Sequence, residues 1–432
     1  MDILKELKPQ TDQVEVIRLQ SESVTVGFEN NRLKSSQTEE TQGTAVRIIK
    51  DGRLGFSASS DAGADEKLVR NVLESAAYGD EVPLSFPAGK PFKDVQIYDK
   101  MIVDLPIPKM VEMGQEIVDT LLEVDSELQV NVNLVRGTRK FDLKNQAEFD
   151  NTYEKSPLSI EYEIFRVEGD DVLIIWDAVA TTVWQDDYLA SARKAGDLLK
   201  SGKKIVNLKS GRMPVLFAPK GTTVLAVPLL NGLNGKNVYT AISPMKEKVG
   251  EQLFDTKLTV VDDPTIDGRY NSAPFDDEGV VSKRNILIKD GVLKGFYYDL
   301  KTAGLSDVDP TGNGARGLFN PPSPSTSNFI IEPGETSLQE MIAGIDQGLL
   351  VEEALGVGQG NTVSGAFSNT LSLAYLIEKG EIVGRVKDVS IAGNIYDVLT
   401  NIAAVSRENE WIYHNYCQPY ILIDDMNVVV KE

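Results

Sequence analysis

Few side chains in this chain of 432 residues could supply catalytic chemistry, and the metal-binding types are the scarcest. The chain contains one histidine, His414, and one cysteine, Cys417. A catalytic zinc ion normally takes three protein ligands from His, Cys, Asp and Glu, so a histidine-rich zinc site is excluded. Two acidic runs remain, Asp262-Asp263-Pro264 and Asp276-Asp277-Glu278. Either could hold a cation or fix a turn by accepting backbone N–H bonds, and the turn is favoured because neither lies in a calcium-loop pattern.

The other candidate groups have simpler interpretations. His414 is predicted to be a surface or hydrogen-bonded side chain, and Cys417 a small packing residue, because no arrangement of nucleophile, base and orienting group is visible around them. The run Gly356-Val357-Gly358-Gln359-Gly360 resembles a phosphate loop only superficially. No Lys-Ser/Thr pair follows it, so a flexible loop is predicted.

The elements that must position these groups fall into two parts. Residues 1–205 are predicted to form an α+β domain made of two repeated units, each a helix plus an antiparallel sheet. An Asp51-Gly52 pair between apolar runs predicts a hairpin, and Asn30 and Asn145 fall at equivalent places in the two units. Apolar periodicity predicts strands at Val14–Leu19 and Val24–Phe28. The expected helices are 64–78, 109–124 and 188–200.

The second part, residues 212–432, is predicted to be a domain of mainly short antiparallel strands, barrel-like or a sandwich, with a few helices. Ser337-Leu338-Gln339-Glu340 is a capping box that opens one helix, and Ile395–Ile402 suggests another. The polar stretch Lys200–Arg212 connects the two domains. Asp307–Ser327 is rich in Gly, Pro, Asn and Ser and is long for a plain connection, which is typical of a functional or mobile loop.

Composition limits the partners and the compartment. The net charge of −21 argues against direct nucleic-acid binding. No run of eighteen apolar residues is present and the first nine residues are too charged for a signal peptide, so neither a membrane span nor export is expected. A single cysteine fits a reducing compartment. The chain is therefore predicted to be cytoplasmic.

Several blocks, taken in order, resemble one family. They are Thr41–Arg47, Asp262–Pro264 with Phe275–Gly279, Thr326–Gly334, and Ser364–Ser368 with Leu376–Gly380. Their order and spacing resemble the TldD/PmbA family, which contains metallopeptidases and inactivated homologs and was once described as modulators of DNA gyrase. The resemblance spans nearly the whole chain.

The resemblance makes the segment Ala226–Gly235 informative. It reads Ala-Val-Pro-Leu-Leu-Asn-Gly-Leu-Asn-Gly, where active relatives carry His-Glu-x-x-x-His-Gly-Leu-Glu-Gly. Ala226, Val227 and Asn231 occupy the positions of the family's His, Glu and His, and Ala and Val have no lone pair to offer zinc. The family's C-terminal cysteine is not equated with Cys417. Taken by itself, the segment is also the start of a buried apolar helix, with Pro228 early in it.

The resemblance therefore implies a chain of the PmbA or TldE branch, with no catalytic residue and no metal of its own. Zinc is expected in a TldD-type partner. The predicted function is that of a non-catalytic subunit of a cytoplasmic metallopeptidase complex, acting in leader-peptide trimming and the degradation of unfolded peptides or small proteins. It would pair with a TldD-like subunit or with itself. The residues expected to contact a peptide are Asn231, Gly232, Asn328 and Arg316.

Two alternatives stay open from the sequence. One is a stand-alone hydrolase that uses a site without zinc, for which Asp276–Glu278 offers carboxylates but no complete catalytic set. The other is a peptide-binding or gyrase-modulating scaffold protein, which the acidic charge permits.

Overall fold

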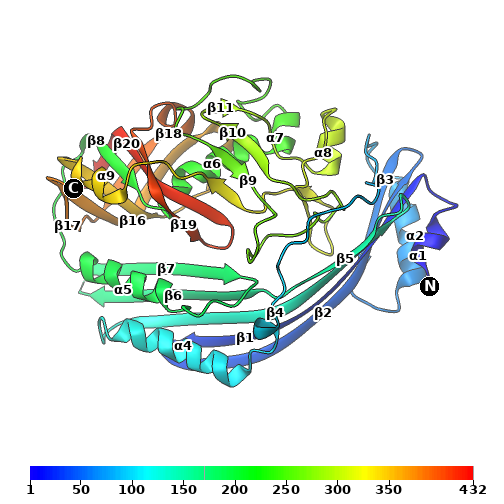
Figure 1. Ribbon diagram of the computed structural model, residues 1–432, viewed down its shortest axis with the longest axis horizontal. Helices are drawn as coiled ribbons and strands as arrows, with labels where there is room; N and C mark the ends of the chain where they lie inside the picture. The colour runs from blue at the N-terminus through cyan, green and yellow to red at the C-terminus, as the bar shows by residue number, and fades with distance from the viewer. Residues whose placement is uncertain (170, 432) are drawn as a thin grey trace.

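Two large β-sheets, one from each half of the sequence, lie against each other in the computed structural model, which describes residues 1–169 and 171–431 (Figure 1). The first sheet uses residues 13–181 and the second uses residues 211–430. Helices flank both sheets. The predicted α+β class is confirmed.

The N-terminal sheet has seven strands in the order β3-β2-β1-β4-β6-β7, with β5 paired to β4. They are β1 (Gln13–Glu29), β2 (Arg32–Lys50), β3 (Arg53–Ser59), β4 (Gln129–Asn145), β5 (Asp150–Lys155), β6 (Leu158–Glu168) and β7 (Asp171–Thr181). The strands predicted at Val14–Leu19 and Val24–Phe28 are both present, but the predicted division between them was wrong, because β1 is continuous and pairs along its whole length with β2. Its polar middle is solvated instead of breaking the strand.

The strand order of this sheet is symmetric about its centre. Strands β1 and β4 are antiparallel neighbours, and each leads outward to its own pair of strands. Asn30 directly follows β1 and Asn145 ends β4. This is the arrangement that two joined units would produce. Common ancestry of the two units stays a prediction.

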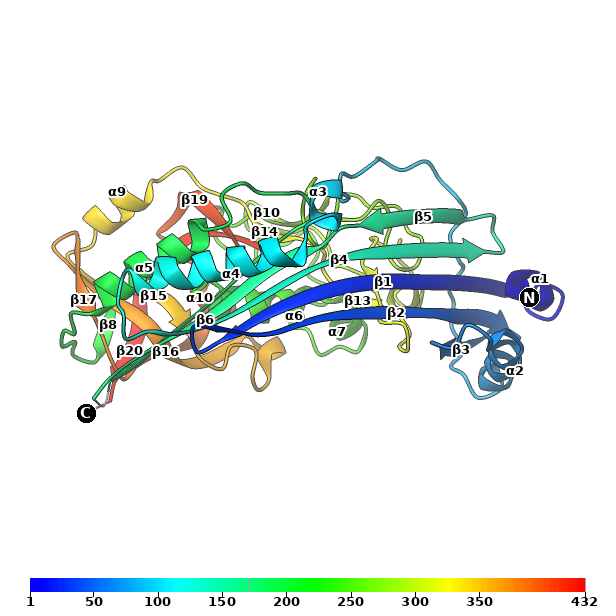
Figure 2. The same ribbon diagram turned by 90° about the horizontal axis from the view of Figure 1, so that it is seen from below.

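Helices α1 (Ile3–Leu7) and α2 (Asp65–Ala76) lie at one end of the long strands, whereas α4 (Ile107–Leu122) and α5 (Ala190–Gly202) lie near the other (Figure 2). A short helix, α3 (Lys100–Val103), precedes α4. Asp51 and Gly52, between β2 and β3, both adopt positive φ, at 51° and 73°. Those angles fit the two-residue turn that the Asp-Gly pair predicts.

The C-terminal half contains a closed five-stranded barrel, formed by β8 (Gly211–Phe217), β15 (Gln347–Ala354), β16 (Ala366–Glu378), β18 (Val389–Asn394) and β20 (Tyr416–Val430). It closes because β20 pairs with both β18 and β8. The remaining strands are β9 (Val260–Asp262), β10 (Asn285–Lys289), β11 (Val292–Leu293), β12 (Gly314–Ala315), β13 (Ser323–Pro324), β14 (Phe329–Ile331), β17 (Glu381–Arg385) and β19 (Ala404–Ile412). The helices are α6 (Thr223–Leu233), α7 (Gly235–Tyr239), α8 (Leu300–Leu305), α9 (Leu338–Ala343), the 3₁₀ turn η1 (Thr362–Ser364) and α10 (Ile395–Val398).

Side chains of the barrel strands alternate between two faces, and each face contributes to a different hydrophobic core. In β8, Val215 and Phe217 pack with the apolar residues of α6, whereas Leu216 packs with α4, α5 and the N-terminal sheet. Successive strand residues point to opposite faces, so one strand serves both cores. The second core therefore joins the two halves of the chain.

The capping box predicted at Ser337 is confirmed: its hydroxyl accepts from the Glu340 N–H, and the Glu340 carboxylate accepts from the Ser337 N–H. Helix α10 ends at Val398, earlier than the predicted Ile402. Among the described residues, no helix combines the length and the hydropathy that crossing a bilayer requires.

Candidate functional site

Helix α6 carries most of the segment predicted to correspond to the metal-binding motif of active relatives. Eight of its eleven residues are buried, and it packs among the inward-facing side chains of the barrel. A helix that is apolar on all sides is expected to be buried in this way. The prediction that Pro228 lies early in the helix was wrong. The helix begins at Thr223, so Pro228 lies inside it. Because proline has no backbone N–H, the Val224 carbonyl lacks its usual intrahelical donor.

Ala226, Val227 and Asn231, the three positions predicted to replace metal ligands and base, lie in different environments. Ala226 is fully buried in the barrel core, whereas Val227 and Asn231 are half-buried on the side that faces the 355–365 loop. The Asn231 amide donates to the Val227 carbonyl at 3.1 Å and to the Thr362 hydroxyl at 2.9 Å. The Asn231 side chain therefore links α6 to η1 by a hydrogen bond. Across the described residues, no group of three His, Cys, Asp or Glu side chains is arranged to hold a metal ion.

Gly232 allows close packing behind the helix. A Cβ atom at this position would come within 2.4 Å of the Tyr396 hydroxyl and 2.7 Å of the Met245 methyl carbon. The Gly232 carbonyl accepts a 2.6 Å hydrogen bond from Ser243. Close packing at the end of α6 therefore accounts for a glycine at this position. A peptide contact by Gly232 stays a prediction.

A cavity of about 490 Å³ lies beside α6. Val224 and Pro228 line it from the helix, and residues 355–359, Thr362 and strand residues 366–370 line the rest. Gly356, Gly358 and Gly360 all have positive φ, as the predicted loop requires.

The first part of β16 presents a strand edge to this cavity. On one side, Ala366–Thr370 pair with β18. On the other side, β15 reaches only as far as Leu371, and the Leu355 N–H donates to the Thr370 carbonyl at 2.8 Å. Backbone groups alternate between the two edges of an antiparallel strand, so those of Ala366 and Ser368 point the same way as Thr370. No described strand pairs with them there, so the edge can accept an extended chain.

The remaining predicted peptide contacts lie elsewhere. Asn328 is fully buried immediately before β14, where its amide donates to the Asp263 carbonyl at 2.7 Å and to the Ser272 hydroxyl at 2.9 Å. The Arg316 side chain is also buried and pairs with Glu15 of the N-terminal domain. The structure thus separates these two residues from Asn231, and a shared role in binding a peptide stays a prediction.

The acidic runs fix turns, as predicted. One Asp276 carboxylate oxygen accepts the N–H groups of Glu278 and Val280, each at 2.9 Å, and the other accepts that of Gly314 at 2.8 Å. In the other run Asp263 fixes the turn by accepting the Thr265 N–H at 2.9 Å. Asp262 instead accepts from the Ser327 N–H at 2.8 Å and from the Asn313 amide at 2.6 Å, so it joins loops that are distant in sequence.

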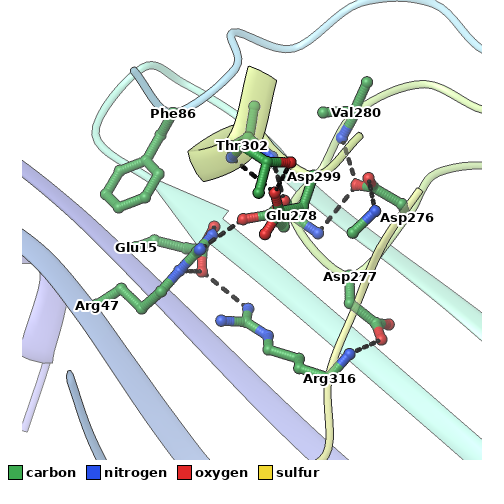
Figure 3. Close-up of polar contacts among 12 residues, drawn as sticks. Glu15, Arg47, Phe86, Asp276, Asp277, Glu278, Val280, Asp299, Thr302 and Arg316 are labelled. Carbon is green, nitrogen blue, oxygen red and sulfur yellow. Dashed lines mark hydrogen bonds and ion pairs between the residues drawn. The ribbon is translucent and has the colours of Figure 1, made fainter. Parts of the chain in front are cut away.

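Glu278 has a further partner that the sequence did not indicate. Arg47 of β2 binds it at 2.5 Å and binds both carboxylate oxygens of Glu15 at 2.9 and 2.8 Å, while Arg316 binds Glu15 at 2.8 Å (Figure 3). Arg47, Glu15 and Glu278 are each at most 2% exposed. These four side chains form a buried ionic network that links the two domains. The available signal was a charged residue inside an otherwise apolar strand, at Glu15 and at Arg47.

His414 and Cys417 do not form a nucleophilic site. The His414 ring stacks on Tyr270 and its Nε2 lies 3.3 Å from the Glu161 carboxylate. Cys417 is buried in β20, and burial raises the pKa of its thiol to about 11. A nucleophilic cysteine needs a lowered pKa, so the packing role predicted for Cys417 agrees with its surroundings.

Stability is expected to fall as the pH rises from about 5 to about 7, because of the buried carboxyls of Asp262, Glu352 and Glu353. Burial raises the pKa of each of the three to about 7 in the folded chain, whereas in an unfolded chain carboxyls titrate near 4. Between those values only the unfolded state loses the proton, which favours unfolding by about 1.4 kcal/mol per pH unit and group. Urea unfolding across this range measures the slope. Glu352→Gln should make it shallower, and an unchanged slope in that variant would contradict the assignment.

Comparison with known proteins places this arrangement in a class of metallopeptidase-related proteins. The profile of the PmbA/TldA metallopeptidase C-terminal domain matches residues 210–430, and that of PmbA/TldA metallopeptidase domain 1 matches residues 14–76. The first match alone covers more than half of the chain. The chain belongs to the TldD/PmbA family.

Individual relatives agree with this assignment. A metalloprotease of Methanocaldococcus jannaschii is 28% identical over 415 residues, which are 92% of this chain and 90% of the relative. A metalloprotease TldD homolog of Haemophilus influenzae is 37% identical over 213 residues, 48% of this chain and 44% of that protein. The crystal structure of TldE from Thermococcus kodakarensis superimposes with a TM-score of 0.90 at 25% identity, covering 99% of both chains.

Proposed function

We propose that this chain is a non-catalytic, TldE-like subunit of a cytoplasmic metallopeptidase complex that acts on unfolded peptides. The observation that carries the proposal is the chemistry of α6. Ala226 is buried in the core and Val227 has no ligand atom, while the Asn231 amide is engaged with Val227 and Thr362. In this proposal a TldD-type partner supplies zinc, with a homodimer as the form taken without that partner.

The contribution of this chain would be to hold the peptide. The edge at Ala366 and Ser368 offers the Ser368 N–H and backbone carbonyls beside a cavity of about 490 Å³, while the Ala366 N–H makes a long 3.4 Å hydrogen bond to Ser364. Strand addition uses main-chain hydrogen bonds, so it tolerates many sequences, which suits unfolded substrates. The adjacent surface of α6 would provide apolar contact.

The test measures zinc content and peptidase activity of the purified chain alone, and of the chain mixed with a TldD-type subunit from the same genome. Zinc and activity are expected only in the mixture, together with a stable complex. Stoichiometric zinc and activity in the isolated chain would overturn the proposal. Activity of the isolated chain that survives strong chelation would also overturn it, in favour of a hydrolase without zinc.

A matched pair of substitutions tests the strand edge. Ser368→Pro removes the N–H that faces the cavity, whereas Ser368→Ala keeps it. Both variants should still form the complex. We expect peptide binding to be lost in the proline variant and retained in the alanine variant. Equal binding by the two would place the peptide elsewhere.

A further inference from the structure

A second cavity, of about 440 Å³, lies between the two domains. Strands β4 and β5 contribute Arg139, Tyr153 and Lys155 from one side. The other side consists of C-terminal loops that include Asp276, Asp277, Arg316 and Thr326. The lining thus brings three cationic side chains together with two carboxylates.

Several N–H groups of Arg139 and Arg316 have no hydrogen-bond acceptor among the described residues. The Arg316 side chain is 1% exposed and uses one terminal nitrogen for Glu15, but its Nε and Nη1 have no hydrogen-bond partner among the described residues. The buried Nε of Arg139 has none there either, and the nearest Arg139 contact to Asp277 is 4.0 Å. A buried, unsatisfied charged donor is costly, so these groups need an acceptor.

The two carboxylates are occupied by other bonds. Asp276 accepts three backbone N–H groups, and Asp277 accepts the Arg316 backbone N–H at 2.9 Å. Arg316 is also paired with Glu15, so what the cavity lacks is acceptors for the remaining guanidinium N–H groups, and the two oxygens of a carboxylate suit such donors.

We propose that this cavity binds a single carboxylate group, held by Arg139, Lys155 and Arg316. Guanidinium and ammonium donors are the groups that recognise carboxylates. The carboxylate could belong to a free small acid or to the C-terminus of a peptide. The site is inferred from the cavity alone and does not depend on the proposed partner.

Lys155 gives the site a pH dependence. Burial, and then the nearby Arg139, lower the pKa of its ammonium group to about 7, while Asp277 opposes the shift. The other groups around it are the Tyr153 ring and the Tyr270 carbonyl, which accepts from Nζ at 3.4 Å. A bound carboxylate would favour the charged amine, so binding should take up a proton and strengthen as the pH falls from about 8 to about 6.

The experiment measures, by calorimetry on the full chain at constant ionic strength, the affinity for acetate and for one unstructured peptide with a free or an amidated C-terminus. Lys155→Met should fold, since the one hydrogen bond of Nζ to a described residue is the long one to Tyr270, and a methionine side chain can still pack against the Tyr153 ring. Arg139→Gln should also fold. Lys144→Met is the control, because it removes an exposed lysine paired with Asp150 on the same sheet and outside the cavity. We expect about tenfold weaker carboxylate binding in the two cavity variants and no change in the control.

The outcomes separate the sources. Tighter binding of the free-carboxylate peptide than of the amide, lost in Lys155→Met and Arg139→Gln, assigns the site to a peptide C-terminus. Equal binding of both peptides, with variant-sensitive acetate binding, assigns it to a free acid. Carboxylate binding that is absent, or equal in wild type, cavity variants and control, would mean that the cavity holds water only and would overturn the proposal. Failure of the zinc and complex tests would leave these measurements unaffected.

Discussion

Replacement of Arg47 by methionine is expected to lower the free energy of unfolding by about 3–5 kcal/mol, because it leaves buried carboxylates without their cation. Arg47 is 2% exposed and binds Glu15 through two parallel hydrogen bonds and Glu278 through a third. Its guanidinium also lies 5.1 Å from the centre of the Phe86 ring. Methionine retains much of the apolar stem but none of the donors, so the loss is mainly electrostatic.

The pH profile of the variant distinguishes this cause from lost packing. In the wild type, burial alone would raise the pKa of Glu15, but Arg316 and Arg47 outweigh it and hold the pKa below its ordinary value. Stability from that lowered pKa is present above the unfolded value and is lost as the pH falls through the folded one. Without Arg47 the Glu15 pKa should rise, so the stability difference between wild type and variant should shrink on acidification below about pH 5.

Guanidinium unfolding followed by circular dichroism measures the effect. Arg53→Met is the control, because the Arg53 side chain is 42% exposed and pairs with Glu81 at the surface, where such pairs contribute about 0–1 kcal/mol. Similar losses in Arg47→Met and Arg53→Met would contradict the importance assigned to the buried network. A loss independent of pH would assign the effect to packing.

Replacement of Phe275 by alanine is expected to cost about 3–5 kcal/mol, the range for a fully buried phenylalanine. Phe275 belongs to the C-terminal half but is fully buried in a cluster made mainly of N-terminal residues. Its ring centre lies 5.0 to 6.5 Å from four aromatic rings, those of Phe92, Phe141, Phe149 and Tyr153. The truncation would leave a cavity at the contact between the domains.

The denaturation curve should show where the loss occurs. Weakened coupling between the domains is expected to broaden the transition or divide it into two steps, since a single transition requires that the domains unfold together. Phe319→Ala is the control, because Phe319 is 59% exposed and its truncation should change stability by less than about 0.5 kcal/mol. A Phe275→Ala variant as stable as this control would contradict the predicted role.

Local patterns predicted many individual elements because their causes are local. The Asp51-Gly52 turn, the capping box at Ser337 and the helical stripe of α4 depend on residues within a few positions of one another. The limits of β1 could not be predicted this way. Its polar middle gives no apolar alternation, and it is held as a strand by pairing with β2 on one side and β4 on the other.

The sequence by itself determined the family, the α+β class and the absence of lone-pair ligands at Ala226 and Val227, because these follow from residue types and their order. Only the tertiary structure decided that Asn231 fastens α6 to η1, and that Arg47 and Glu278, 231 positions apart, share a hydrogen bond. It also placed Arg139, Lys155 and Arg316 around one cavity. The physical reason is that burial, pairing and an unsatisfied donor depend on neighbours brought together by folding, which no local spacing records.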